Sequence, residues 1–438
     1  MTTDLLLRSA SEQARLIASG TLSAAALLER QLASIAARNP QINAFVEVLT
    51  APPPESECQP AATSPLAGTS FAVKDNIDVA GVPSHAGLRA LHAPVAARDA
   101  KVVARLRAAG LHCLGKLNMH AVALGASNHN ADFGDCTNPH RVTHTPGGSS
   151  GGSGAAVAAG FCGIALGTDT MGSVRIPAAY CGVVGFKPSF GALPSDGLLP
   201  LSSLLDHIGI LARSVEDVVH AFSIVRDHHA GALADAASDM AASDGFDLAM
   251  PDDLAAMGAT EDVCEAFAAA LPRLRAAGFR LHTVDMAGYP FSATRRAGLL
   301  LCEAELNHTL AAALAAHRAE MPSELLSMLD FGRSRGAVDL ARATAVVVGA
   351  GRWLTRTIAP FDGLLLPTAP QQAFAMDGPV PHHQADFTAM ANMSGAPAIS
   401  LPLPVGDGVL PIGLQLVGHR GRDDALLRAA RAAEAALR

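Results

Sequence analysis

The fold is decided by five segments between residues 66 and 194: TSFAVKD (69–75), DAKVVARLRAAG (99–110), CLGKLN (113–118), GSGAAVAAGF (152–161) and GIALGTD (163–169). The first, third and fifth are short and mostly apolar, which is typical of buried parallel strands. The second and fourth have the composition and length of helices. Strands that alternate with helices in this way indicate an α/β fold with a largely parallel sheet.

The sequence before and after these segments also shows regular patterns. Leucine and isoleucine recur at three- and four-residue spacing over residues 4–37, which predicts two helices with breaks at Gly20 and Pro40. The proline-rich stretch 51–65 predicts a surface loop, because proline fixes φ and lacks an N–H donor. An alanine-rich, acidic stretch around 230–245 predicts an exposed linker.

The alternation resumes in the C-terminal half of the chain. FDLAMP (246–251) predicts a strand and TEDVCEAFAAALPRLRAAG (260–278) predicts a helix. Residues 298–358 are predicted to be mostly helical. AISLPLPV (398–405) and IGLQLVG (412–418) predict an apolar pair near the end of the chain. We find no internal repeat.

Composition and charge exclude several classes of protein. Of the 438 residues, 50% are hydrophobic and 16% are charged, as expected of a globular protein with a large core. The net charge is −8 without any basic run, which argues against direct binding of nucleic acid and against a polybasic membrane surface. The first twenty residues lack the pattern of a signal peptide, and no long uncharged apolar stretch predicts a membrane span. We therefore expect a cytoplasmic protein.

Cysteine and histidine give no sign of a metal centre. The seven cysteines are scattered and form no CxxC pair, so we expect reduced, buried packing residues. Among the 17 histidines the densest spot is His382-His383, but adjacent residues point in different directions and no HExxH spacing occurs. We expect no metal and no organic cofactor.

The segment TPGGSSGGSGAAVAAG (145–160) is the most informative for function. Glycine density of this kind permits close approach of the backbone to a ligand and dihedral angles that other residues avoid. N–H groups at the start of the following helix could receive an anion. A phosphate-binding loop of the Walker type would need a Gly-Lys-Ser/Thr sequence, and no lysine lies in this loop. A flexible linker is disfavoured, because a predicted helix and strand follow at once.

A second segment, GTDTMGSVRIPAAYCGVVGFKPS (167–189), places Ser173 on a turn just beyond a strand. Backbone N–H groups of such a turn can converge on a developing oxyanion. The Ser173 hydroxyl needs a base, and this segment contains neither a GxSxG elbow nor a histidine. The base must therefore come from another part of the chain.

A third segment, FAVKDNIDVAGVPS (71–84), puts Lys74 at the end of an apolar strand. A free lysine has a pKa of about 10.4, and burial can lower it by several units, after which the amine can act as a base. A single lysine is normally a solvated surface charge. The apolar run before Lys74 and the Asp75-Asn76 pair after it favour the functional interpretation here.

Together the three segments resemble the amidase signature family, whose hallmarks are the Gly/Ser-rich loop, a TDTxGSxRxPA turn and a lysine on an upstream strand. Lys74 and Ser149 are 75 residues apart, and Ser149 and Ser173 are 24 apart, which fits the family. The resemblance implies one α/β domain over residues 1–438, with a core signature region at 66–213. Its central sheet would be twisted, mixed and mostly parallel, sandwiched between helices.

The resemblance also implies a role for each residue of the site. Ser173 would be the acylated nucleophile, and Ser149, entered through a cis peptide from Gly148, would relay its proton to a neutral Lys74. The backbone N–H groups of the turn would form the oxyanion hole, and three further residues would support the loop and the turn. The four turn residues are Thr170, Met171, Gly172 and Ser173, and the three supports are Ser150, Asp169 and Arg175.

One residue departs from the family pattern. The family usually has glycine where this chain has Met171. A backbone donor survives any side chain except proline, so catalysis need not fail, but a thioether would project near the acyl pocket. We expect Met171 to alter the choice of substrate.

The expected activity is hydrolysis of a C–N bond in a small-molecule amide, with water as the second reactant. One alternative is the glutaminase-type A subunit of a tRNA-dependent amidotransferase, which shares the signature. A second is a carboxybiuret or allophanate hydrolase, suggested by SLLDHIGILA (203–212) and GDCTNPH (134–140). A third, a catalytically silent assembly subunit, is opposed by the intact Lys74, Ser149 and Ser173. A homodimer is one possible assembly, and the sequence does not determine the oligomeric state.

Overall fold

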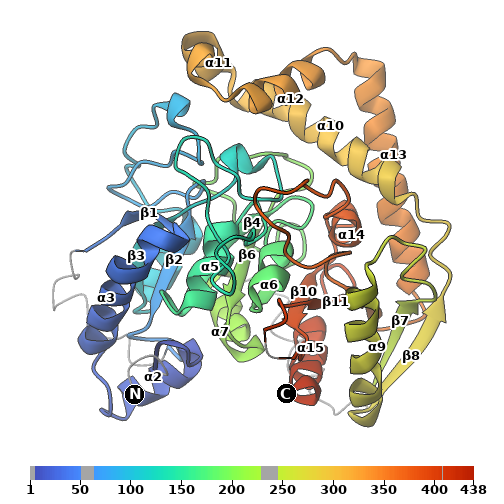
Figure 1. The fold of residues 1–438 in the computed structure, drawn as a ribbon, viewed down its shortest axis with the longest axis horizontal. Coiled ribbons are helices and arrows are strands. Elements are labelled where there is room, and N and C mark those ends of the chain that lie inside the picture. Colours follow the sequence, from blue (N-terminus) through green and yellow to red (C-terminus); the bar gives the residue numbers. More distant parts are fainter. Residues whose placement is uncertain (1–4, 51–63, 228–244, 407) are drawn as a thin grey trace.

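The computed structural model describes residues 5–50, 64–227, 245–406 and 408–438 (Figure 1). Its centre is one eleven-stranded sheet. In order across the sheet the strands are β1 (Phe45–Val48), β3 (His112–Leu117), β2 (Ser70–Lys74), β4 (Ile164–Asp169), β6 (His207–Ala212), β5 (Val184–Lys187), β10 (Ala398–Pro402), β11 (Gly413–Val417), β9 (Gly363–Pro367), β7 (Phe246–Pro251) and β8 (Phe279–Val284).

The sheet is mixed, but the prediction that it is mostly parallel was wrong. Among the described strands, four neighbouring pairs are parallel and six are antiparallel. Five of the six antiparallel pairs lie together in the middle, from β4 to β9, and the sixth joins β1 and β3 at one edge. The chain between β2 and β4 contains helices, and these two strands run parallel. The connection between β10 and β11 is short and contains no crossover helix, so these two strands pair antiparallel.

Alternate residues of the central strands pack into two separate apolar layers, so both faces of the sheet are buried there. Ile164 and Leu166 pack on one face, while Ala165 between them packs on the other. The first face is covered by α4 (Lys101–Ala108), α7 (Val215–Val225), α9 (Glu261–Ala276) and α15 (Asp423–Leu437). The second is covered by α3 (Ala24–Ile42), α5 (Gly151–Ala159), α6 (Arg175–Cys181) and α14 (Asp386–Met393). The expected sandwich of helices around one sheet is confirmed.

Two helices contain a proline, and one of them runs slightly further than predicted. After α2 (Ala10–Ala18), α3 continues through Pro40 to Ile42, whereas α9 includes Pro272 and stays within the predicted range 260–278. A proline costs its helix one hydrogen bond, and packing of the apolar face against the sheet compensates for that loss. The predicted loop over most of 51–65 and the predicted linker around 230–245 lie almost wholly outside the described residues.

A group of helices stands above the sheet at one end, and we call residues 291–358 the helical arm (Figure 1). It consists of α10 (Phe291–Thr309), α11 (Ala311–His317), the short helix η3 (Arg318–Glu320), α12 (Ser323–Arg333) and α13 (Ala337–Ile358). An apolar cluster joins the arm to the body through residues on both sides, including Leu88, Met119, Leu306 and Leu325. The arm therefore packs on the loops at the ends of β2 and β3.

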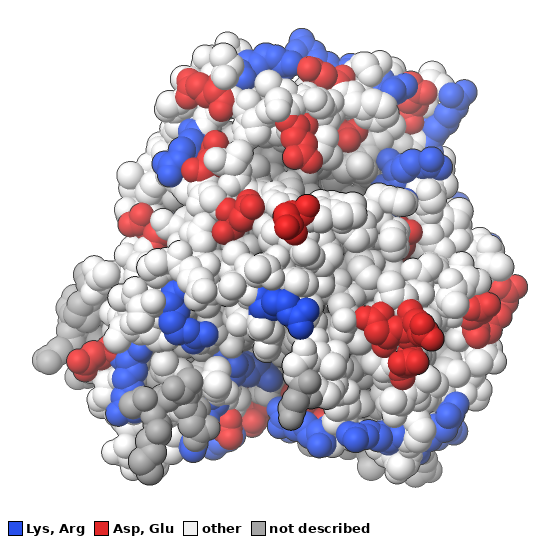
Figure 2. All heavy atoms as spheres, in the orientation of Figure 1, with Lys and Arg blue, Asp and Glu red and all other residues white. Residues whose placement is uncertain are grey.

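Charges of both signs occur on the visible face of the molecule. Figure 2 shows lysine and arginine interspersed with aspartate and glutamate, without a continuous basic surface on this face. Among the described residues, no single helix is long and apolar enough to cross a membrane. One pair, Phe291–Thr309 with Ala311–Glu320, meets the length and composition criteria together but is bent by 67°.

Candidate active site

Lys74 ends β2 and is completely buried, as its position in the sequence predicts. Its Nζ donates to Ser149 Oγ at 2.7 Å and to Thr168 Oγ1 at 2.8 Å. Lys74 is the last residue of β2, and β4 is the neighbouring parallel strand. The long side chain of Lys74 therefore reaches the carboxyl end of β4. The lysine and the glycine-rich loop, 75 residues apart in sequence, are thus in direct contact.

The surroundings of Lys74 favour the neutral amine. Burial lowers the pKa of Lys74 from 10.5 to about 7, although the charges of Asp206 and Asp169 raise it in part. The cause is desolvation, because an ammonium loses its hydration when the side chain is enclosed. Near neutral pH a substantial fraction of Lys74 therefore has a lone pair with which to accept a proton.

The glycine-rich loop presents Ser149 to Lys74 just before α5 begins. The Gly148–Ser149 peptide bond is cis, as the resemblance implies. The loop is held on both sides, since His120 N donates to the Ser149 carbonyl at 3.1 Å and Gly151 N donates to Asn128 Oδ1 at 3.1 Å. These contacts fix the backbone on which the Ser149 hydroxyl stands.

Ser150 ties the same loop to β4. Its Oγ donates to the Thr168 carbonyl at 3.1 Å and accepts from Thr168 N at 3.2 Å. Its backbone N donates to the Ser173 carbonyl at 3.1 Å. Ser150 therefore connects the loop that carries Ser149 with the turn that carries Ser173.

Ser173 lies on the turn between β4 and α6 and keeps 9% of its surface exposed. The N–H groups of Thr170, Met171 and Ser173 have no hydrogen-bond acceptor within the described part of the chain. Three backbone donors beside one serine hydroxyl can stabilise an oxyanion that forms on a carbonyl carbon attacked by Ser173.

Gly172 does not belong to this set of free donors, and here the sequence prediction was wrong. Its N–H donates to Asp169 Oδ1 at 2.7 Å. The residue has φ of +135°, which turns the amide toward the buried carboxylate and which favours glycine. A Cβ at this position would also overlap the Thr388 hydroxyl. Gly172 shapes the turn, and its neighbours supply the donors.

Asp169 and Arg175 form a buried ion pair under the turn. Arg175 Nε donates to Asp169 Oδ2 at 2.9 Å and Nη2 donates to Oδ1 at 2.8 Å, with both side chains fully buried. Burial by itself would raise the pKa of Asp169, but the Arg175 guanidinium outweighs it and holds that pKa well below its usual range. Arg175 also donates to Gln415 and Asn392. The pair anchors the turn to two distant segments.

Arg175→Met is expected to lower the free energy of unfolding by about 3–5 kcal/mol, because it leaves the Asp169 carboxylate buried without its cation. Urea unfolding followed by circular dichroism measures this loss. Arg15→Met is the matched control, since Arg15 pairs with Glu216 at the surface, where an ion pair contributes less than about 1 kcal/mol. Equal losses in the two variants would contradict the anchoring role of Arg175.

Several residues of the site were missed by sequence reasoning. Asp206 accepts from Thr170 Oγ1 at 2.6 Å, and burial raises the pKa of Asp206 to about 6. Asn392 on α14 donates to Asp169 Oδ1 at 2.8 Å, and Thr388 donates to the Met171 carbonyl at 2.6 Å. Thr168 stands in the quoted segment next to Asp169, so its position was a usable signal. For Asn392 and Thr388, more than 200 residues downstream, no local signal exists.

The Met171 side chain packs under the helical arm. It is partly buried against the apolar cluster that includes Met393 and Leu301. A Cβ added to Gly298 of α10 would come within 2.8 Å of the Met171 sulfur and 2.9 Å of the Met393 methyl carbon. Glycine at 298 therefore leaves the space that the thioether fills.

The described cysteines are consistent with packing roles. Six are free thiols, and four of these are buried: Cys136, Cys162, Cys181 and Cys302. Burial raises the pKa of Cys162 to about 12, so this thiol stays protonated. Cys58 lies outside the described residues.

Comparison with known proteins agrees with this geometry. A family model described as Amidase matches residues 26–427. The A subunit of the Glutamyl-tRNA(Gln) amidotransferase of Halobacterium salinarum is 35% identical over 90% of this chain and 99% of its own length.

Two solved structures superpose over nearly the whole chain. A 6-aminohexanoate cyclic dimer hydrolase complexed with substrate has 28% identity and a TM-score of 0.86, covering 99% of this chain and 97% of that one. The A subunit of the Glutamyl-tRNA(Gln) amidotransferase of Thermotoga maritima also has 28% identity but a TM-score of 0.77, covering 94% of each chain.

Proposed function

This chain belongs to the amidase signature family, and from that premise we propose that it hydrolyses a small-molecule amide through an acyl-enzyme on Ser173. Amidohydrolysis is the activity of the family. The nucleophile, the proton relay and the class of substrate are the parts that we propose. No metal or organic cofactor is needed for this chemistry, because a serine, an amine and backbone donors suffice for acyl transfer.

In the first half of the reaction, Ser173 Oγ attacks the amide carbonyl carbon. Its proton passes to Ser149 Oγ, and the Ser149 proton passes to the lone pair of Lys74 Nζ. The N–H groups of Thr170, Met171 and Ser173 bind the oxyanion. When the C–N bond breaks, the proton returns from Lys74 through Ser149 to the leaving nitrogen. Ammonia or an amine departs and an ester remains on Ser173.

In the second half, water attacks the ester carbonyl. Its proton moves along the same relay to Lys74 and then returns to Ser173 Oγ as the carboxylic acid leaves. Each proton that enters the relay also leaves it, so the enzyme is restored. Ser149 acts in both halves as the bridge between the nucleophile and the base.

The observation that carries this proposal is the contact between Lys74 and Ser149. A fully buried lysine whose Nζ lies 2.7 Å from a serine hydroxyl, and whose pKa falls to about 7, is equipped to accept a proton at neutral pH. Within hydrogen-bond range, Lys74 meets hydroxyl and carbonyl oxygens. Lys187 is also buried but, among the described residues, bonds only to backbone carbonyls, so the serine hydroxyl is what distinguishes Lys74.

Two observations bear on the substrate. At the same sequence identity, the 6-aminohexanoate cyclic dimer hydrolase superposes better than the Thermotoga protein, which favours a hydrolase of small amides. The sequence relatives favour a second candidate, the glutaminase-type component of a tRNA-dependent amidotransferase, with a protein partner in place of the homodimer. Carboxybiuret or allophanate hydrolysis would use the same residues on a carbamoyl substrate.

The test is a screen of the purified chain alone against aliphatic, aromatic and carbamoyl amides and glutamine, with detection of ammonia. Turnover of an amide other than glutamine by the isolated chain, at a rate abolished by Ser173→Ala, is the expected result. Release of ammonia from glutamine only, and only when companion subunits are added, would overturn the proposal in favour of the amidotransferase component. Light scattering of the same sample distinguishes a homodimer from a monomer.

We expect Met171 to set the size of the acyl group, because its thioether fills the space between the oxyanion turn and Gly298. Met171→Gly should shift preference toward a bulky acyl group. Gly298→Ala should shift it toward a small one, because a methyl group there pushes the thioether aside. Each shift should correspond to about 1–3 kcal/mol in the ratio of kcat/KM for the two amides, the range for one or two methylenes.

The two variants serve as controls for each other, since they change the same contact in opposite directions. The measurement is kcat/KM for one small and one bulky amide from the screen. An equal change for both amides in Met171→Gly would show that residue 171 tunes the backbone of the turn, and the role in specificity would then be dropped.

A further inference from the structure

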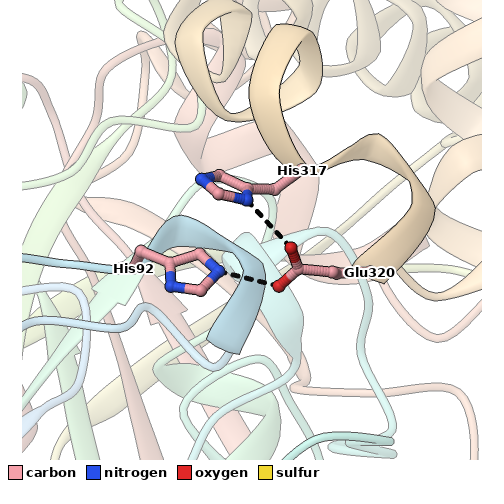
Figure 3. A group of neighbouring side chains, drawn as sticks. All are labelled: His92, His317 and Glu320. Atoms are coloured by element: carbon pink, nitrogen blue, oxygen red, sulfur yellow. Dashed lines mark hydrogen bonds and ion pairs between the residues drawn. The ribbon is translucent and has the colours of Figure 1, made fainter.

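A cluster of two histidines and one glutamate joins the helical arm to the body (Figure 3). His92 follows the short helix η1 (Arg89–Leu91) of the body, His317 ends α11, and Glu320 ends η3. His92 and Glu320 are 228 residues apart in sequence, so the cluster exists only in the folded chain.

The three side chains point toward one another. His92 Nε2 lies 2.7 Å from one Glu320 carboxylate oxygen, and His317 Nδ1 lies 2.9 Å from the other. The two imidazole rings are 4.0 Å apart between centroids and tilted by 35°.

We propose that His92 Nε2, His317 Nδ1 and a Glu320 carboxylate oxygen bind one divalent transition-metal ion, with Zn²⁺ as the reference ion. One ligand atom from each residue lies within 4.8 Å of the other two. Metal–ligand bonds of about 2.0–2.1 Å place the ligand atoms roughly 3.4 Å from one another. The hydrogen-bonded His–Glu pairs, now at 2.7 and 2.9 Å, would open slightly to admit the ion, and small rotations of the side chains allow this, since the three are one-third to one-half exposed.

The donor set indicates which ions fit. Two imidazole nitrogens and one carboxylate oxygen suit Zn²⁺, Ni²⁺ or Cu²⁺, whereas Mg²⁺ and Ca²⁺ prefer oxygen ligands alone. Exposure to solvent leaves room for water at the remaining coordination positions. The ligating nitrogens must be unprotonated, and His92 Nδ1 and His317 Nε2, which have no partner among the described residues, can carry the imidazole protons.

The position of the proposed metal site predicts how a bound ion would affect the stability of the fold. One ligand comes from the body and two come from the helical arm, so a bound ion would connect these two parts of the chain. The apolar cluster of Leu88, Ala90, Leu310 and Met321 lies in the same contact between arm and body. An ion that binds the folded arrangement and not the unfolded chain raises the unfolding temperature, and the rise continues as the ion concentration exceeds its dissociation constant. This effect is independent of amide hydrolysis.

The test is isothermal titration of metal-free protein with ZnCl₂ at pH 7.5 in a non-chelating buffer. Wild type should bind one ion that both His92→Gln and His317→Gln weaken by about tenfold or more. His308→Gln is the matched control, because His308 is an exposed histidine of the same arm outside the cluster, and it should bind as wild type. MgCl₂ should give no binding at this site.

Two further measurements, the Co²⁺ absorption spectrum and the unfolding temperature, test metal binding independently of the titration. Co²⁺ in place of Zn²⁺ should give a visible absorption spectrum in wild type and in His308→Gln, and lose it in His92→Gln. Excess Zn²⁺ should raise the unfolding temperature of wild type by roughly 2 °C or more and leave the His92→Gln/His317→Gln double variant unchanged. Equal Zn²⁺ affinity in wild type and the double variant, with the double variant folded without metal, would overturn the proposal.

Discussion

Ser173→Ala is expected to lower kcat on any amide substrate by on the order of 10⁶-fold, because it removes the only nucleophile that lies beside three free backbone donors in the described structure. The protein should remain folded, since the exchanged hydroxyl is small and stands on a turn held by Asp169 and Arg175. Steady-state ammonia release measures the loss, and circular dichroism checks the fold.

Ser153→Ala is the matched control for this variant. Ser153 is also a buried serine of the glycine-rich segment, but its Oγ donates to the Leu166 carbonyl at 3.1 Å and faces away from the relay. The control should keep most of its activity. Retention of more than a few per cent of the wild-type rate by Ser173→Ala would exclude Ser173 as the nucleophile.

Lys74→Met is expected to lower kcat at pH 7.5 by about 10²–10⁴-fold, the contribution of a general base. Lys74→Arg should be equally impaired, because a guanidinium retains the positive charge but cannot lose its proton near neutral pH. Stopped assays with a sensitive ammonia probe resolve rates in this range. Activity of either variant that matches wild type between pH 7 and 9 would require another base.

The pH dependence of the wild type provides a second test of Lys74. The neutral amine is the active form, so kcat/KM should rise with pH on a limb near 7, where burial places the pKa of Lys74, and then level off. An ascending limb near 10.4, the value for a free lysine, would show that the amine is not desolvated during catalysis.

The same lowered pKa makes a prediction about stability. Between pH 7 and about 10 the unfolded chain holds a proton on Lys74 that the folded chain does not, so stability rises with pH. Relative to Lys74→Met, the wild type should gain about 1.4 kcal/mol per pH unit across this window. Urea unfolding of both proteins at several pH values measures the difference. A constant difference would mean that Lys74 is charged in the folded protein.

Local patterns in the sequence predicted the elements that carry the site. The apolar run before Lys74 predicted a buried strand end, and the glycine-rich segment predicted a loop followed by a helix. These signals succeed because a short apolar strand and a glycine-dense turn have few alternative structures. The family resemblance added the pairing of Lys74 with Ser149, which spacing alone does not establish.

Other features depend on contacts between distant segments, and the sequence could not reveal them. The predominance of antiparallel pairs in the mixed sheet follows from how its strands are connected, which apolar runs do not encode. The hydrogen bond from the Gly172 amide to the Asp169 carboxylate depends on the dihedral angle of one residue in the folded turn. His92 and Glu320 have no pattern in sequence that joins them, and only the packing of the helical arm brings them together.

The central claim, an acyl-enzyme on Ser173, is tested most directly by rapid acid quench of the enzyme during turnover of an active amide, followed by mass spectrometry. Trypsin leaves Ser149 and Ser173 together in the peptide of residues 142–175, so fragmentation of that peptide is needed to place the acyl group. We predict an added acyl mass on Ser173 that Ser173→Ala lacks. An adduct on Ser149, or continued turnover with no adduct at any time point resolved by the quench and with no burst of the first product, would contradict the account.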